Sequence, residues 1–443
     1  MSFDLFLETL LLERYNTRLV VLGTILLGTC SGLIGSFLLL RKQSLLGDAL
    51  SHATLPGIGL AFAVMSALGI SGRSLPGLLL GATTTGLLGV LLVLAIRRTT
   101  RLKDDAAMGI VLSVFFGLGV VILRMVQTIP GQSSAGLESF IYGKTASMVW
   151  SDFILISSVL TLTVLATLLL LKELTLLCFD EAFARSQGFR TTLLDILLMA
   201  LVTAVTVTGL QSVGLILIIA FLIIPATAAR FWTHDLRQML LISAFIGGLS
   251  GWLGASSSAL APGLPSGAVI VVAAAFIFVI SMAFGPARGI LPRYRHHRAL
   301  QRKMGRQHLL RSIFEILENL QQPPLQNIPV PMEALHRHRY WGKGELKRLI
   351  RHARHEDHLA RRPHGEIRLS ESGFGEASRI TRNHRLWELY LIRHADIAPS
   401  HVDRDADMVE HLLGPEMVLR LEQELNADKH TEAGNLVQSP HAI

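Results

Sequence analysis

The chain has 443 residues, of which 50% are hydrophobic and 17% are charged, whereas a soluble globular chain averages about 25% charged residues. Residues 1–285 hold 16 Lys and Arg and 13 Asp and Glu, and residues 286–443 hold the other 25 and 20. Fifteen of the 17 His also follow residue 285. This division excludes a single soluble domain, and two Cys in apolar surroundings exclude a disulfide scaffold or a Cys-based zinc finger.

The first 285 residues contain repeated apolar stretches that are long enough to cross a bilayer, which takes about 20 mainly apolar residues. Gly, Ala, Ser and Thr are frequent in them, as is typical of helices that pack closely in lipid. We therefore predict an all-α polytopic membrane protein with eight or nine transmembrane helices in this part. The nine candidate stretches lie near residues 17–40, 44–66, 75–96, 106–127, 151–171, 191–209, 213–231, 239–259 and 266–285.

Lys and Arg between the stretches predict the orientation, because cytoplasmic loops carry an excess of both. With nine crossings all the basic segments fall on one side, which we assign to the cytoplasm. These segments are residues 41–42, 97–103, 172–190, 230–237 and the chain after residue 285. The C-terminal part is therefore expected in the cytoplasm.

Asp48 and His52 are the most informative polar residues within the stretches, because polar groups in hydrocarbon are costly. Positions i and i+4 share one helix face, so a carboxylate and an imidazole there can hold one divalent cation. Pro56 and Gly57 follow and would loosen the helix, which frees carbonyls near the site. Two alternatives remain. The residues could form an Asp–His hydrogen bond that holds two helices together, or they could lie at the membrane interface.

Residues 179–190 predict a short amphipathic helix that ends at Gly188 and could dock on a soluble partner, or could simply connect two spans. A nucleotide-binding loop of the form Gly-x4-Gly-Lys-Ser/Thr is absent, since the nearest match, Gly143-Lys144-Thr145, has Glu138 in place of the first Gly. We therefore expect no catalytic activity in this chain and ATP hydrolysis by a separate chain.

Residues 17–285 resemble the membrane subunit of the zinc, manganese and iron ABC importers. The resemblance rests on residues 47–57 (GDALSHATLPG), 139–144, 181–188 (EAFARSQG), 214–226 and 265–268. It implies a bacterial inner-membrane permease that pairs with a second copy or a sibling permease. It also implies an ABC ATPase and an extracellular metal-binding lipoprotein as partners. Asp48 and His52 fall at the family's intramembrane polar site, and Glu181, Ala182 and Gly188 fall in its ATPase-coupling helix.

The second part begins with a basic linker over residues 286–304, which suits the anionic cytoplasmic surface of a membrane. A helix is predicted over residues 307–320, and two short helices over 332–340 and 344–359 follow as a helix-turn-helix. Residues 363–369 would form a small hairpin wing. The second short helix is basic, which suits DNA phosphates or, alternatively, a membrane surface or RNA. Its candidate DNA-binding residues are Lys343, Lys347, Arg348, Arg351 and Arg354.

The remaining helices carry candidate metal ligands. His384 and Glu388 are four residues apart within a predicted helix over 371–397, and Asp407, Glu410 and His411 share one face of a further helix. Oxygen and imidazole donors without Cys suit Mn(II), Fe(II) or Zn(II) as effector. Ordinary acidic helices also place Glu beside His, so the alternative is that these residues bind no metal.

Residues 305–441 resemble the metal-dependent repressors of the diphtheria-toxin-repressor and manganese-regulator type. The resemblance rests on residues 369–373, 382–391 (RNHRLWELYL) and 405–413 (DADMVEHLL). It implies a winged helix-turn-helix over 305–375 and metal-binding and dimerisation helices over 376–443. It makes His308, His384, Asp407, Glu410 and His411 metal ligands with Glu388 auxiliary. Arg311 falls where manganese-type members can have an acid.

We therefore predict a divalent-metal ABC permease fused to a metal-responsive, repressor-like tail. Two outputs of the tail remain open. Either it binds operator DNA, tethered or released near residues 286–304, or it senses metal and gates transport without binding DNA. A hydrolytic metal centre is disfavoured, because the tail shows no nucleophile or substrate-pocket pattern.

Overall fold

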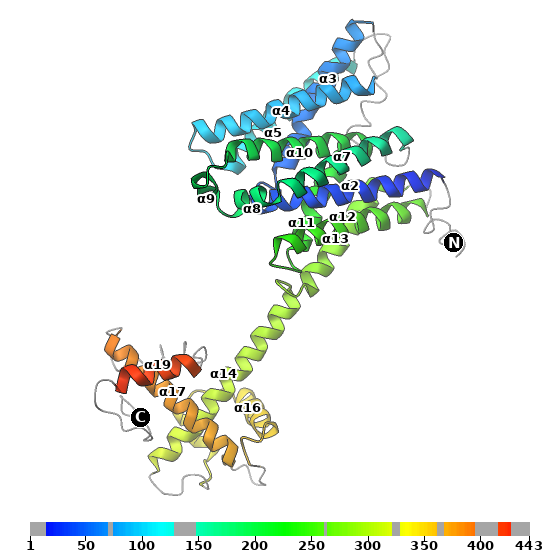
Figure 1. Cartoon of the computed structure of the whole chain (residues 1–443). Helices are drawn as coiled ribbons and strands as arrows, with labels where there is room; N and C mark the ends of the chain where they lie inside the picture. The colour runs from blue at the N-terminus through cyan, green and yellow to red at the C-terminus, as the bar shows by residue number, and fades with distance from the viewer. Residues whose placement is uncertain are drawn as a thin grey trace. The chain divides into compact units, whose positions relative to one another are not determined.

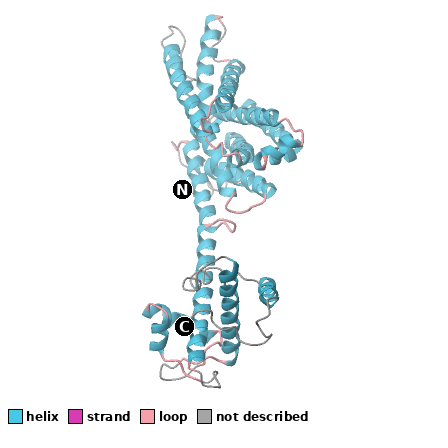
Figure 2. Cartoon of the chain, turned by 90° about the vertical axis from the view of Figure 1, so that its left-hand side faces the viewer, coloured by secondary structure: helices cyan, strands magenta, loops and turns pink. Residues whose placement is uncertain are grey.

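The computed structural model describes residues 15–69, 74–127, 148–260, 264–320, 328–360, 367–394 and 415–426. The chain divides into two compact units, Met1–Arg293 and Tyr294–Ile443. Helices make up nearly all of the described elements in both units (Figure 2). This agrees with the all-α class predicted from the sequence.

The first unit is a helical membrane bundle (Figure 1). Among the described residues, eight helices are long and apolar enough to span a bilayer. They are α2 (Tyr15–Leu40), α3 (Leu46–Ala67), α4 (Leu75–Thr99), α5 (Asp104–Gln127), α7 (Trp150–Leu169), α10 (Thr191–Val213), α12 (Leu236–Ala259) and α13 (Ser266–Phe284).

The seventh of the nine predicted stretches forms a shorter helix, α11 (Leu215–Ala229). Gly214, at φ +86°, separates it from α10, and such a left-handed backbone is one that Gly adopts without strain. Its 15 residues rise about 22 Å, which is less than the roughly 30 Å of a bilayer core. Apolar composition alone made this segment resemble a full span.

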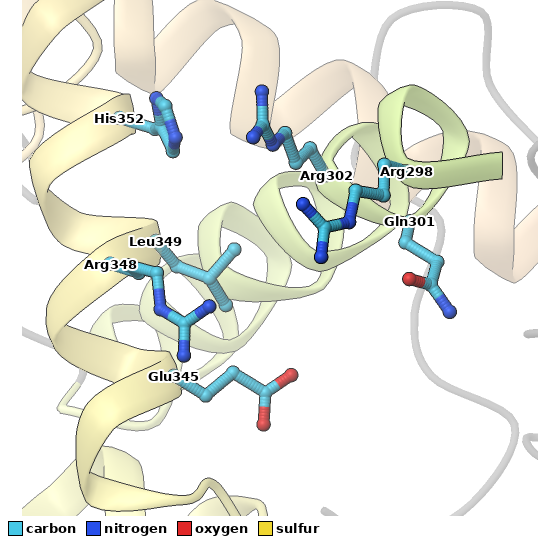
Figure 3. A pocket seen from close by; sticks show the side chains of 7 residues that line it. All are labelled: Arg298, Gln301, Arg302, Glu345, Arg348, Leu349 and His352. Atoms are coloured by element: carbon cyan, nitrogen blue, oxygen red, sulfur yellow. The ribbon is translucent and has the colours of Figure 1, made fainter. Parts of the chain in front are cut away.

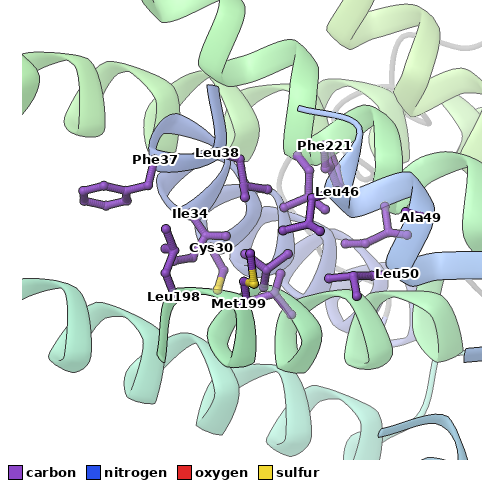
Figure 4. Packing of buried hydrophobic residues seen from close by; sticks show 14 of the residues in the cluster. Cys30, Ile34, Phe37, Leu38, Leu46, Ala49, Leu50, Leu198, Met199 and Phe221 are labelled. Atoms are coloured by element: carbon purple, nitrogen blue, oxygen red, sulfur yellow. The ribbon is translucent and has the colours of Figure 1, made fainter. Parts of the chain in front are cut away.

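Small residues let the bundle helices approach closely. A Cβ on Gly28 of α2 would lie 2.3 Å from the carbonyl oxygen of Gly247 on α12, and one on Gly57 of α3 would lie 2.0 Å from that of Gly81 on α4. Only Gly fits at such crossings. The apolar core beside these contacts is formed by side chains from four helices (Figure 4). They include Cys30, Ile34, Phe37, Leu38, Leu46, Ala49, Leu50, Leu198, Met199 and Phe221.

The helix directions bring the basic segments of the bundle to one end. The Ser243 hydroxyl of α12 donates to the carbonyl of Gly32 while Gly28 meets Gly247, so α2 and α12 run antiparallel. The end of α2 therefore lies at the start of α12. The backbone N–H of Ala287 donates to the carbonyl of Phe231 at 3.0 Å, which places the end of α13 there too. Ion pairs that are described below place residues 97–104 and 180–195 at this same end of the bundle.

The second unit contains α14 (Ile290–Asn319, from Tyr294 on), α15 (Met332–His338), α16 (Lys343–His355), α17 (Glu371–His394) and α19 (Pro415–Asn426). The predicted basic linker is thus largely helical. The second short helix ends at His355, four residues before the predicted end, because Asp357 adopts φ +59° and Leu359 pairs with Leu369 in an antiparallel bridge. A second antiparallel bridge joins Val330 and Ile367, and residues 363–366 of the expected wing lie outside the described residues.

The start of α17 is fixed by local chemistry. The Ser370 hydroxyl accepts from the backbone N–H of Gly373 at 3.0 Å, which caps the helix. A Cβ on Gly373 would lie 1.9 Å from the carbonyl oxygen of His358, so no other residue fits there without a shift. The core of this unit packs Leu309, Leu310, Ile313, Phe314, Leu317, Leu335, Leu346, Leu349, Ile350, Ala353, Ala377 and Ile380.

Candidate transport and metal-sensing sites

Asp48 and His52 lie on one face of α3. The Nε2 atom of His52 is 3.3 Å from Oδ1 of Asp48, and 18% and 30% of the two side chains are exposed. The His52 ring meets the ring of Phe116, on α5, edge-on at a centroid distance of 4.8 Å. Nδ1 of His52 is buried and makes no hydrogen bond within the described part of the chain. The pair therefore offers an imidazole and a carboxylate that are both partly exposed.

Pro56, inside α3, frees a backbone carbonyl close to this pair. Proline has no N–H to donate to the carbonyl four residues earlier, and that carbonyl belongs to His52. A cation held between the side chains of Asp48 and His52 would thus find a carboxylate and an imidazole, and the freed carbonyl faces the next turn of α3. Mn(II), Fe(II) and Zn(II) accept such mixed oxygen and nitrogen ligands.

The predicted amphipathic loop helix forms α9 (Glu181–Ser186), which follows α8 (Leu171–Phe179). The Asp180 carboxylate caps α9 by accepting from the backbone N–H of Phe183 at 2.8 Å, and Gly188 ends the turn at φ +85°. Ala182, Phe183 and Gly188 are exposed. The helix therefore presents a short surface that includes an aromatic side chain.

Glu181 is the charged anchor of α9. Burial raises the pKa of its carboxyl, but the hydrogen bond from Arg185 and the charge of Arg41 lower that pKa more, so the pKa lies below its ordinary value. Arg41 also donates to Asp195 at 2.7 Å and to the carbonyl of Leu177 at 2.9 Å. The sequence did not predict the contact between Arg41 and Asp195, because 154 residues separate them in the chain.

In the second unit, α16 has one apolar and one cationic face. Leu346, Leu349, Ile350 and Ala353 are buried, whereas Lys347, Arg348 and Arg351 are exposed and Arg354 is half-buried. The side chain of Lys343 lies outside what the structure describes. The five predicted DNA-binding residues therefore include three on the open surface of one helix.

A basic groove of about 450 Å³ lies between α14 and α16 (Figure 3). Arg298 and Arg302 of α14 face Arg348 and His352 of α16 across it, and Glu345 lies at its edge. The groove extends the cationic face of α16 onto the basic segment of α14. Such a surface attracts phosphate groups.

The described metal-ligand candidates of the tail are His308, His384 and Glu388, which are 9%, 1% and 0% exposed. His384 Nε2 is 3.0 Å from Glu388 Oε1. Each imidazole also contacts an arginine: Nδ1 of His308 is 3.1 Å from Arg339, and Nδ1 of His384 is 2.6 Å from Arg311. Asp407, Glu410 and His411 lie outside the described residues. Within the described part of the chain, no three His, Cys, Asp or Glu side chains gather as one metal-binding group.

The imidazole and carboxylate groups of the tail suit a divalent metal, but the arginine that contacts His384 does not favour metal binding there. A guanidinium only donates hydrogen bonds, so Nδ1 of His384 accepts from Arg311 and the ring proton sits on Nε2, where Glu388 accepts it. A metal-ligating imidazole instead donates its other N–H to an acceptor. A metal on Nε2 of His384 would therefore turn the Nδ1–H of the ring toward the guanidinium, so Arg311 in this position opposes metal binding.

Family models match both parts of the chain. Residues 14–285 match the ABC 3 transport family. Residues 370–437 match the iron dependent repressor, metal binding and dimerisation domain. The second match includes α17 and α19 and the segment that holds Asp407, Glu410 and His411.

Relatives cover both the bundle and the tail. The chain is 37% identical over 394 residues to the manganese transport system membrane protein MntC of Bacillus subtilis, which covers 89% of this chain and 88% of that protein. It is 45% identical over 281 residues to the zinc transport system membrane protein TroC of Treponema pallidum, which covers 63% of this chain and 93% of that protein.

A solved structure shares the fold of the bundle. The structure of PsaBC from Streptococcus pneumoniae in complex with Fab matches 67% of this chain and 100% of the compared chain, with a TM-score of 0.56 and 30% identity. The family model covers more than half of the chain, and the eight apolar helices make it a multi-pass membrane protein. The chain belongs to the ABC 3 transport family.

Proposed function

We propose that this chain is the permease subunit of an ABC importer for a divalent transition metal ion, with manganese, zinc and iron as the candidate cargoes. The observation that carries the proposal is the half-buried Asp48–His52 pair on one face of α3, just before the helix turn in which Pro56 frees a carbonyl. The relatives named for manganese and zinc transport support the same cargo class.

The energy and the cargo would come from partner proteins. A separate ATPase would dock on α9, because this helix is exposed, ends at Gly188 and carries Glu181 and Ala182 at its start. An extracellular metal-binding lipoprotein would deliver the ion at the opposite end of the bundle. A second permease, identical or a sibling, would complete the pathway. The basic segments that gather at the α9 end support a cytoplasmic tail after α13, in a protein of the bacterial inner membrane.

The tail would act as a metal-responsive DNA-binding domain. In this proposal α15 and α16 form the helix-turn-helix over 305–375, the two bridges form the base of a wing, and residues 376–443 bind metal and dimerise. The exposed cations of α16 and the groove shared with α14 suit the phosphates of duplex DNA. The match of residues 370–437 to a repressor domain favours this output over a tail that only gates transport.

Transport tests the first half of the proposal. The full chain is reconstituted in proteoliposomes with its ATPase and lipoprotein, and ATP-driven uptake of Mn²⁺, Zn²⁺ and Fe²⁺ is measured. We expect uptake of at least one ion, and its loss in Asp48→Asn and in His52→Ala. Asp105→Asn, the same change at an exposed position on α5, is the matched control. Undiminished uptake by both site variants would refute the role of α3.

DNA binding tests the second half. Fluorescence anisotropy measures the binding of the full chain in detergent to duplex DNA from upstream of its own operon, with and without each metal. We expect metal-dependent, sequence-selective binding that weakens in Lys347→Ala/Arg351→Ala, and a salt slope that falls by about one for each phosphate contact removed. Arg379→Ala, at an exposed position on α17, is the control. Metal binding without any DNA affinity would instead support a gate on transport.

A further inference from the structure

Five charged side chains from α4, α5, α9, α10 and the end of α2 meet at the α9 end of the bundle. We call them the Arg41 cluster, and its members are Arg41, Arg97, Asp104, Glu181 and Asp195. Arg41 follows the last residue of α2, and only 7% of its side chain is exposed. Its guanidinium lies 3.3 Å from Glu181 of α9 and 2.7 Å from Asp195 of α10. One side chain thus joins the proposed docking helix to two spans.

Asp195 extends the cluster to two further spans. One of its carboxylate oxygens accepts from Arg41, and the other lies 3.5 Å from Nη1 of Arg97, in the last turn of α4. Nε of Arg97 is 2.9 Å from Asp104, the first residue of α5. The ion pairs therefore run without interruption from α9 to the start of α5.

The helix α5 carries this connection to the cargo site. Its Phe116 touches the ring of His52, and a Cβ on its Gly119 would lie 2.7 Å from the Cβ of Leu55 and 3.1 Å from Pro56. The α5 helix therefore contacts α3 next to His52 and at the proline. A shift of α5 along its axis therefore disturbs the packing around His52, because densely packed side chains transmit strain.

Two properties of Arg41 let it hold the elements of the cluster together: its guanidinium group and its burial. A guanidinium offers five donors in a rigid fork, so Arg41 can hold Glu181, Asp195 and the carbonyl of Leu177 at once, whereas an ammonium is a single point charge. Separating Arg41 from Asp195 is strongly unfavourable because both are buried, at 7% and 11% exposed, and Glu181 binds the same guanidinium from a partly exposed position. Movement of α9 away from the end of α2 is therefore resisted unless Arg41 and Asp195 follow.

We propose that Arg41 is a positioning residue that transmits movement of α9 to the cargo site, through Asp195, Arg97 and α5 to Phe116 and His52. This inference rests on the proposed transport function and adds the residues that couple ATP hydrolysis to ion movement. Arg41 itself contacts neither the ion nor the ATPase in this account. It fixes the relative positions of the elements that do.

The test measures metal uptake and ATP hydrolysis in the same proteoliposomes that contain the full importer. In Arg41→Lys we expect the number of ions imported per ATP to fall at least tenfold, while ATP hydrolysis stays within twofold of the wild type. A merely structural role would lower both rates together through loss of assembled complex, which size-exclusion chromatography measures. An unchanged ratio of uptake to hydrolysis would overturn the proposal. Arg101→Lys, the same change at an exposed position between α4 and α5, is the matched control.

A double-variant cycle identifies the contact that transmits the movement. Arg41→Lys and Asp195→Asn alter the same contact, so the combined variant should be no worse than the more impaired of the two single variants, and losses that multiply would contradict the path. Arg97→Lys tests the next step by the same ratio, and replaces Arg41→Lys if that variant does not assemble. Failure of the wild-type importer to take up any metal would refute the proposed function, whereas normal coupling in these variants would refute only this inference.

Discussion

Replacing Arg311 should strengthen metal binding by the tail, although loss of a buried charged residue usually weakens a site. In the described structure Arg311 donates to Nδ1 of His384 and lies 3.3 Å from Glu315. A metal on Nε2 of His384 would need the ring proton on Nδ1, where it faces a guanidinium that can only donate. Arg311→Met keeps an unbranched side-chain stem and removes both the donor and the charge.

The magnitude follows from the geometry. The 2.6 Å contact, the width of the ring and a metal–nitrogen bond of about 2.1 Å place a divalent ion about 6.5 Å from the guanidinium nitrogen. Charges of one and two at that distance repel by about 1.3 kcal/mol even in a medium as polar as water, and by more in a partly buried site. The expected gain in affinity is therefore about tenfold or more.

The assay is competition for Mn²⁺ and Zn²⁺ against a fluorescent chelator. It uses the full chain in detergent, with Asp48→Asn/His52→Ala as background so that only the tail binds. Arg379→Met is the matched control, because Arg379 pairs with Glu376 on an exposed part of α17 and touches no candidate ligand. Unchanged or weaker affinity in Arg311→Met would show that the arginine supports the metal site instead of competing for it.

Three further changes should have measurable effects. Burial raises the pKa of Glu315, but hydrogen bonding from His338 and the charge of Arg311 lower it more, so this pKa lies below its ordinary value. The tail should therefore lose stability as the pH falls below about 4.5. Glu315→Gln should weaken this pH dependence in acid-unfolding curves. Asp180→Ala removes the cap of α9, which costs about 1 kcal/mol of helix stability, and should weaken ATPase binding in pull-down titrations, whereas unchanged binding would separate the cap from docking. Gly28→Leu places a side chain against the backbone of α12 and should lower the thermal stability of the detergent-solubilised bundle; an unaltered unfolding temperature would contradict the close crossing.

The local features of the chain were predictable from the sequence. Apolar length placed the spans, and Asp180 and Gly188 bound a short helix that the amphipathic pattern predicts. The exception was α11, where apolar composition does not reveal that Gly214 ends the preceding helix. The end of α16 was misplaced for a similar reason, because the left-handed backbone of Asp357 and the pairing of Leu359 are tertiary features.

The contacts between distant residues were not predictable. The i, i+4 rule brings Asp48 to His52 and His384 to Glu388, and the structure shows both pairs. It says nothing of Arg311 against His384, 73 residues away, or of Arg41 against Asp195. The ligand roles of His308, His384, Glu388, Asp407, Glu410 and His411 remain predictions, as do the roles of the basic residues of α16.

The most direct test of the account is to locate the transported ion. Anomalous scattering from crystals of the importer loaded with Mn²⁺ under non-hydrolysing conditions would show its position. We predict a peak within coordination distance of the Asp48 carboxylate and of a ring nitrogen of His52, which disappears in Asp48→Asn. A loaded importer whose bundle peak lies elsewhere, or whose α3 site stays empty at saturating metal, would contradict the account.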